Sequence, residues 1–185
     1  MFSPAEIQKI RDLIFSRDSH TVQQGLEFVD IMAFSTADIV TIVGRPIPQS
    51  YKEWREVLLY SRYCQQTTLY HVWLLGKLAE FEEPWVKSLK KVDLRSLGLS
   101  FLPKSLFALT DIVSLDVRGN PLEELPDNLQ ALRVDRAQWD KFSLEIFTIH
   151  SLRYLHLPHL NIDSLPEEIG NLTHLEFLNI QKNKY

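Results

Sequence analysis

The sequence predicts an α/β fold in which α-helices come first and a stack of short parallel strands follows. Apolar residues keep helical spacing through residues 1–88. From Leu89 onward, aliphatic residues instead recur in one fixed order with a period of about 23 residues. The apolar content of 45% is enough for a core in both parts. We therefore predict an α-helical N-terminal domain at 1–88 and a repetitive domain at 89–185.

The first three helices have recognisable starts and stops. Ser3, Pro4 and Glu6 form a capping box with proline at the first helical position, so a helix begins there. Residues 16–19 interrupt the pattern and supply a second cap. The buried stripe of the second helix is Val22, Leu26 and Val29. A short third helix, Ala37–Val43, ends at a loop rich in glycine and proline.

Residues 50–81 are rich in helix formers and aromatic residues. We expect two helices with a break near Cys64 to Thr68, and a single bent helix is the alternative. Because the first strand of a stack exposes an unpaired edge and apolar core, the helices are expected to cap it. An independent recognition domain is the other interpretation.

The repetitive half contains about five units, the last one incomplete. Successive units start 23 residues apart at Leu89 and Ile112 and again at Leu152 and Leu175, while the second unit has only 17 residues. The third unit, from Leu129, departs most from the pattern, and a local bulge is expected at 137–141.

These units resemble the intracellular leucine-rich repeats of bacterial and plant proteins. The resemblance is closest from Leu165-Pro166 to Asn183, and the Leu125-Pro126-x-x-Leu turn is similar to the short repeats of bacterial type III effectors. It implies an α/β leucine-rich repeat solenoid, a short parallel β arc, preceded by an α-helical capping domain. It also implies that the amides of Asn120 and Asn183 bond to backbone along the stack.

The residues between the inward-facing leucines are expected to line a concave binding face, because side chains alternate along a strand. Phe177 is the most informative of them, since an exposed phenylalanine on a sheet face does not help solubility. Aromatic residues and arginine commonly anchor protein interfaces. The predicted partner-binding residues are Arg95, Asp116, Arg118, Arg133, Tyr154, His156, Phe177 and Asn179.

Two other interpretations of this face stay open. Asp116 is within reach of Arg118 and Arg133, and Arg118 of Asp135, so the charges could form a self-neutralising ladder that only keeps the surface soluble. Phe177 could also be covered by a further repeat or by a second copy of the chain.

Catalysis and cofactors are not expected. The close pair His156 and His159 has no carboxylate or cysteine at ligand spacing, so no metal site is predicted. A nucleophilic Cys64 would need a histidine within hydrogen-bond reach, and His71 lies two helical turns away. No phosphate-binding or hydrolase motif is present in the sequence.

Composition excludes other classes of partner. The net charge of −4 gives neither half the basic excess of a nucleic-acid-binding protein. No apolar segment has the length of a membrane span, and the N-terminus lacks the pattern of a secretory signal. A single cysteine indicates a reducing compartment, the cytoplasm.

The predicted function is non-catalytic binding of another protein through the concave face. The alternative is a regulatory or targeting segment of a larger bacterial effector or signalling protein whose catalytic part lies elsewhere. A hydrolase or ligase acting through Cys64 is the third class. Self-association through the uncapped C-terminal repeat is the alternative to a different protein as partner.

Overall fold

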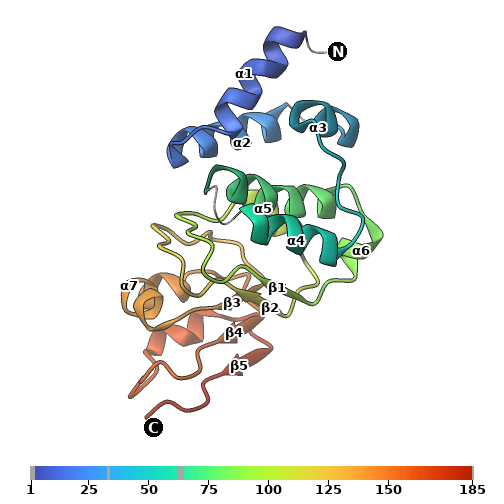
Figure 1. Ribbon diagram of the computed structural model, residues 1–185. Helices are drawn as coiled ribbons and strands as arrows, with labels where there is room; N and C mark the ends of the chain where they lie inside the picture. The colour runs from blue at the N-terminus through green and yellow to red at the C-terminus, as the bar shows by residue number, and fades with distance from the viewer. Residues whose placement is uncertain (1–2, 33, 62–64, 185) are drawn as a thin grey trace. The chain divides into compact units, whose positions relative to one another are not determined.

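The chain is described by a computed structural model, which covers residues 3–32, 34–61 and 65–184. It divides into two compact units (Figure 1). The first comprises the helices up to Val86 together with Pro103–Ala108, and the second comprises Lys87–Leu102 and the chain from Leu109 onward. The domain boundary that the sequence indicates after residue 88 stays a prediction.

The first unit is helical, as predicted. Its helices are α1 (Pro4–Ile14), α2 (Ser19–Ile31), α3 (Thr36–Val43), α4 (Tyr51–Ser61), α5 (Gln65–Glu80), α6 (Pro84–Lys87) and the 3-10 helix η1 (Lys104–Ala108). The capping box before α1 is confirmed: Ser3 Oγ accepts from Glu6 N, and Ser3 N donates to Glu6 Oε2. Asp18 caps α2, and Gly44 ends α3 in the left-handed conformation. In the described part of the chain, no helix is both long and apolar enough to cross a bilayer.

Helices α4 and α5 pack on each other, so the described residues 51–61 and 65–80 belong to two helices and not to one bent helix. The indole Nε1 of Trp54 in α4 donates to the backbone oxygen of His71 in α5 at 2.8 Å. The predicted junction near Cys64 lies outside the described residues, whereas Thr68 lies inside α5.

A buried lysine joins α2 to α5. Lys77 Nζ lies 3.2 Å from Asp30 Oδ1 and also pairs with Glu80, while its side chain is only 8% exposed. Trp73 Nε1 donates to the same Asp30 oxygen at 3.0 Å. The carboxylates thereby supply the partners that a buried ammonium requires.

The second unit is built on a sheet of short strands. They are β1 (Lys91–Asp93), β2 (Ser114–Asp116), β3 (Ala131–Arg133), β4 (Tyr154–His156) and β5 (Phe177–Asn179). All neighbours are parallel, and the strands follow one another in chain order (Figure 1). The predicted α/β class is therefore confirmed as N-terminal helices followed by a five-stranded, all-parallel sheet.

The register agrees with the period of about 23 residues that the sequence shows. Lys91 is opposite Ser114, and Tyr154 is opposite Phe177. The middle residue of each of the strands β1 to β4 points into the core, because these side chains are at most 1% exposed: Val92, Leu115, Leu132 and Leu155. Leu178 of β5 is only half-buried.

The connection between β3 and β4 differs from the prediction. In place of a bulge at 137–141 it contains α7 (Arg136–Ile146). Asp135 and Gln138 form a capping box at its start, and Trp139, Phe142 and Ile146 are buried along one side. The other connections contain no α-helix in the described residues, and η2 (Glu167–Asn171) precedes β5.

Two asparagines bond to backbone groups as the resemblance implied. Asn120 Oδ1 accepts from Leu97 N and Leu99 N at 2.9 and 3.1 Å, and its Nδ2 donates to two carbonyls. Asn183, which follows β5, makes the equivalent four bonds: its Oδ1 accepts from Leu160 N and Ile162 N, and its Nδ2 donates to two carbonyls.

Candidate functional site

The predicted binding residues lie on or just after the five strands. Six of them belong to strands β2 to β5, while Arg95 and Arg118 come two residues after β1 and β2. The structure groups them into a charged cluster and an aromatic cluster. Asn179 joins neither cluster through a side-chain bond, because its Oδ1 accepts from Gln181 N in the turn that follows β5.

The charged cluster is centred on Asp116, whose side chain is 11% exposed. Arg118 binds it with two hydrogen bonds, from Nε to Oδ1 at 2.8 Å and from Nη2 to Oδ2 at 2.7 Å. The Nε atoms of Arg95 and Arg133 lie 3.7 and 3.8 Å from Oδ2. Three guanidinium groups therefore surround one carboxylate, and we call Arg95, Arg118 and Arg133 the arginine cluster.

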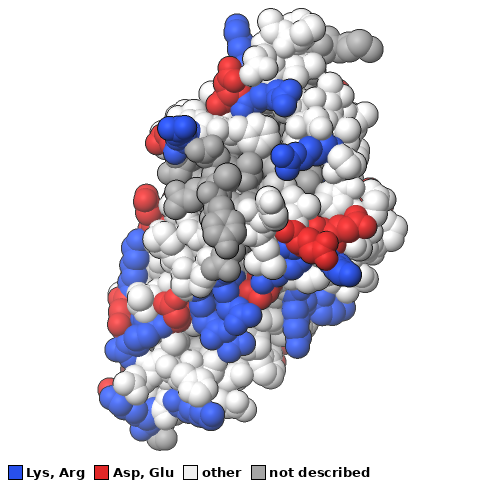
Figure 2. All heavy atoms as spheres, viewed as in Figure 1, with Lys and Arg blue, Asp and Glu red and all other residues white. Residues whose placement is uncertain are grey.

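The arginine cluster has more positive than negative charge. Asp93 pairs with Arg95 through two contacts of 2.9 Å, so two carboxylates face three guanidinium groups. The predicted contact of Arg118 with Asp135 is replaced by another, because Asp135 accepts from Gly119 N and caps α7. In Figure 2, Lys and Arg side chains gather over the region where Figure 1 draws β1 to β3, with acidic groups among them.

Arg133 has an unsatisfied donor. Its Nε is buried and has no hydrogen-bond partner within the part of the chain that the structure describes. The contact with Asp116 at 3.8 Å is an ion pair that is too long for a hydrogen bond. About a third of the Arg133 side chain remains exposed to solvent. A buried N–H without an acceptor is unfavourable, so Arg133 is the least satisfied member of the arginine cluster.

The aromatic cluster comprises Tyr154, His156 and Phe177. The His156 and Phe177 rings lie 5.2 Å apart at 42°, and Phe177 is 46% exposed. His156 Nε2 lies 3.2 Å from the backbone oxygen of Val113, beyond β3. The small, fully buried Ala131 of β3 leaves room for the imidazole to extend in this direction.

Tyr154 is held by two residues that the sequence analysis missed. Glu176 accepts a hydrogen bond from the Tyr154 hydroxyl at 3.0 Å and binds Arg153 Nε at 2.8 Å. Arg153 directly precedes β4 and Glu176 directly precedes β5. Opposite charges therefore stand at equivalent positions of two neighbouring strands. That pairing of charges is the sequence signal that could have identified them.

These bonds shift the ionisation of Glu176. Hydrogen bonds from Arg153 and then from Tyr154 lower the pKa of Glu176 below its usual 4.5, while the bond to Glu176 raises the pKa of Tyr154. Because the folded-state pKa is lowered, ionised Glu176 favours folding above the unfolded-state pKa. This contribution is lost as the pH falls through the lowered value.

We expect Arg153→Gln to return the pKa of Glu176 toward its usual value, because the Arg153 hydrogen bond is the largest cause of the shift. An NMR titration of the Glu176 carboxyl carbon measures this change. Tyr154→Phe is the matched control and should produce a smaller rise. An unchanged Glu176 pKa in Arg153→Gln would contradict the described geometry.

A metal site and a cysteine nucleophile are the two kinds of chemical site that the sequence raises. The described residues contain no group of three His, Cys, Asp or Glu side chains that could hold a metal ion. Absence of a metal or cofactor stays a prediction. Cys64 lies outside the described residues, so its predicted distance from His71 is not tested.

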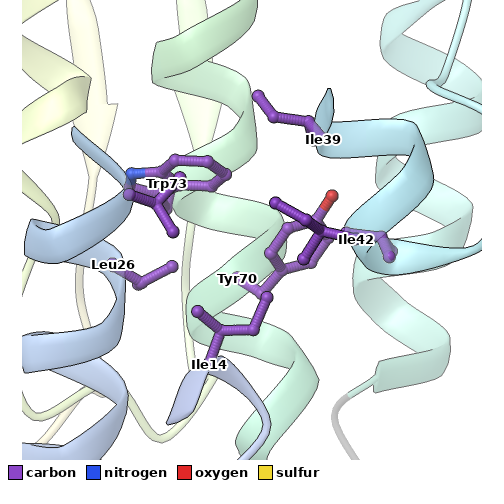
Figure 3. A pocket seen from close by; sticks show the side chains of 8 residues that line it. Ile14, Leu26, Ile39, Ile42, Tyr70 and Trp73 are labelled. Carbon is purple, nitrogen blue, oxygen red and sulfur yellow. The ribbon is translucent and has the colours of Figure 1, made fainter. Parts of the chain in front are cut away.

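A small cavity lies among the helices of the first unit. Ile14, Leu26, Ile42 and Tyr70 point into a common space there (Figure 3). Its volume of about 10 Å³ is far below the ~300–1,000 Å³ of ligand pockets. Its lining is apolar except for the Tyr70 hydroxyl, and burial raises the pKa of this tyrosine. We interpret the cavity as a packing gap of the helical core.

Comparison with known proteins does not assign the chain to a family. No family model matches it, and no solved structure matches it. Its class is therefore defined by the fold alone: the described residues form an α/β protein with N-terminal helices and a five-stranded, all-parallel sheet.

Proposed function

We propose that this chain is a leucine-rich repeat protein with an α-helical cap, and that its function is non-catalytic binding of another protein. The binding surface would be the strand face, defined as the arginine cluster, Asp116, the aromatic cluster and Asn179. The sequence period supports the repeat assignment, since residues opposite each other in the sheet, such as Tyr154 and Phe177, are one unit apart. The bonds of Asn120 and Asn183 to the preceding unit support it as well.

The cap assignment is supported by the packing of α5. Ser105 of η1 donates from Oγ to the backbone oxygen of Trp73 in α5 at 2.9 Å. Residues 103–108, which the sequence assigns to the first repeat, thus share a compact unit with the helices.

The observation that favours binding most is the exposure of Phe177. Its ring is 46% exposed on the sheet, whereas Ala131 at the equivalent position of β3 is fully buried. The ring lies against His156 and near Tyr154, which is held in place by Glu176. Rigid aromatic side chains of this type are the usual anchors of protein interfaces.

We expect Phe177→Ala combined with Tyr154→Ala to weaken partner binding at least about 30-fold, since interface anchors contribute about 2 kcal/mol or more. The full chain would capture a partner from the native host, and affinity for that purified partner would be measured by calorimetry. The melting temperature should stay within about 2 °C of wild type, because substitutions at exposed positions change stability little.

Leu144→Ala is the matched control. Leu144 is a large apolar residue on α7, outside the strand face, and is 62% exposed. Its replacement should leave affinity unchanged. Equal affinity of the double variant and the Leu144 variant would overturn the proposed binding surface.

A further inference from the structure

The charged and aromatic clusters are neighbours on one sheet. Arg133 of β3 is directly opposite His156 of β4, and Phe177 belongs to the next strand, β5. Neighbouring strands are about 4.8 Å apart, and Phe177 lies two residues, about 6.6 Å, along β5 from Asn179, the residue in line with Arg133. The backbone positions of Arg133 and Phe177 are therefore about 12 Å apart. A positively charged site and an apolar site thus lie a short, fixed distance apart.

The arginine cluster has the donors for an oxyanion. Arg118 already binds Asp116 through two hydrogen bonds, whereas Arg133 Nε has no such bond among the described residues. The Arg95 side chain is 53% exposed and that of Arg133 is 33% exposed, so part of each side chain is open to solvent. Planar guanidinium groups bind carboxylate and phosphate oxygens with strong, charge-assisted hydrogen bonds.

We infer that the strand face binds an extended peptide segment that places an oxyanion on the arginine cluster and an apolar side chain on Phe177. An extended chain advances about 3.3 Å per residue, and residues separated by an even number of positions point to the same side, so the ~12 Å between the two sites corresponds to four residues. The segment crosses the strands, with an acidic residue at one position and an apolar residue four positions away. This inference rests on the proposed function, because it specifies what the same surface recognises.

The oxyanion can be the carboxylate of glutamate or the phosphate of phosphoserine. Both offer acceptor oxygens to guanidinium groups, and phosphate has the larger charge. The experiment below separates them by using both peptides. Binding should weaken with added salt, because exposed charges are screened.

The test uses the full chain and fluorescein-labelled decapeptides in a Gly/Ser background, with anisotropy as readout. One peptide has glutamate four positions before phenylalanine, and a second has phosphoserine in place of the glutamate. A third has glutamine there, and a fourth has glutamate seven positions before phenylalanine. We expect the first or the second peptide to bind at least tenfold more tightly than the third and fourth, and the tighter of the two identifies the source of the oxyanion.

Two variants test the arginine cluster itself. Arg133→Gln should weaken binding of the acidic peptide about tenfold or more and leave binding of the glutamine peptide unchanged. Arg95→Gln, at a more exposed position, should act in the same direction without affecting folding. Lys184→Gln is the matched control, because Lys184 is an exposed cation of the same unit outside the strand face.

The outcomes distinguish the inference from the proposed function. Equal affinity for the glutamate, phosphoserine and glutamine peptides, or full affinity in both arginine variants, would overturn the oxyanion site. If Phe177→Ala still abolished peptide binding in that case, the proposed binding surface would be retained and only the oxyanion site would be rejected. Failure of wild type to bind any of the peptides would overturn the inference, and Phe177-dependent capture of a host protein would then decide the proposed function separately.

Discussion

Replacement of Gly76 by alanine is expected to lower the free energy of unfolding by about 2 kcal/mol, although alanine favours helix formation. Gly76 lies in α5, where η1 comes close to the helix. A Cβ atom at this position would lie 2.2 Å from the carbonyl carbon of Ser105 and 2.3 Å from its oxygen. These are backbone atoms, so no side-chain rotation can relieve the overlap. Overpacking costs ~1–3 kcal/mol or more, which outweighs the ~1 kcal/mol gained in helix propensity.

The measurement is urea denaturation followed by circular dichroism. Gly170→Ala is the matched control, because a Cβ there has no atom within 4 Å, and it should change stability by no more than about 0.5 kcal/mol. If Gly76→Ala were as stable as the Gly170 variant, the close approach of α5 and η1 would be wrong. The loss also tests the proposed cap, since η1 comes from the segment assigned to the first repeat.

Local patterns in the sequence predict much of this fold. The capping box of Ser3 and Glu6 depends only on neighbouring residues, so the start of α1 could be located in advance. The strand register could be predicted for a different reason. Side chains alternate along a strand, and a period of about 23 residues therefore places equivalent residues, such as Tyr154 and Phe177, opposite each other.

Helix α7 shows where the pattern was ambiguous. The apolar residues of this connection can be buried whether it is irregular or helical, because both conformations can bury a residue every three or four positions. In the structure the buried residues include Trp139, Phe142 and Ile146. The deciding signal was the pair Asp135 and Gln138, which forms a capping box. Asp135 was instead assigned to the charge ladder, so its role as a cap was missed.

Gln138 shows a related limit. The third unit lacks asparagine at the position equivalent to Asn120, and Ala137 stands there. One residue later, Gln138 Nε2 donates to the backbone oxygen of Val117 at 2.9 Å. The longer amide thus bonds to backbone from a neighbouring position, which only the helical conformation of α7 makes geometrically available.

The candidate site could be predicted as a set of residues but not as two clusters. Alternation along strands predicts that Asp116 and Arg133 are neighbours, and the structure confirms their contact. Side-chain conformations decide the rest. Arg118 binds Asp116 of its own strand, which leaves the Arg133 Nε without a hydrogen-bond partner among the described residues.

Removal of the Asn120 amide is expected to lower the free energy of unfolding by about 3 kcal/mol or more. Asn120 is 6% exposed and makes four hydrogen bonds to backbone atoms. Asn120→Ala would leave the N–H groups of Leu97 and Leu99 and the carbonyl of Leu94 without these bonds, whereas the carbonyl of Val117 keeps its bond from Gln138. Each buried polar group left unsatisfied costs ~1 kcal/mol or more, and alanine supplies no replacement.

Asn183→Ala separates the effect of burying the amide from the effect of the number of hydrogen bonds that it makes. Asn183 makes the same four bonds, with Leu160 N, Ile162 N and two carbonyls, but it is only half-buried. Water can replace its amide, so the expected loss is about 1–2 kcal/mol. Urea denaturation of both variants measures the difference. Equal losses of stability would show that solvent reaches both sites alike, which contradicts the burial of Asn120. A loss two or more times larger in the Asn120 variant would show that burial sets the cost of removing the amide.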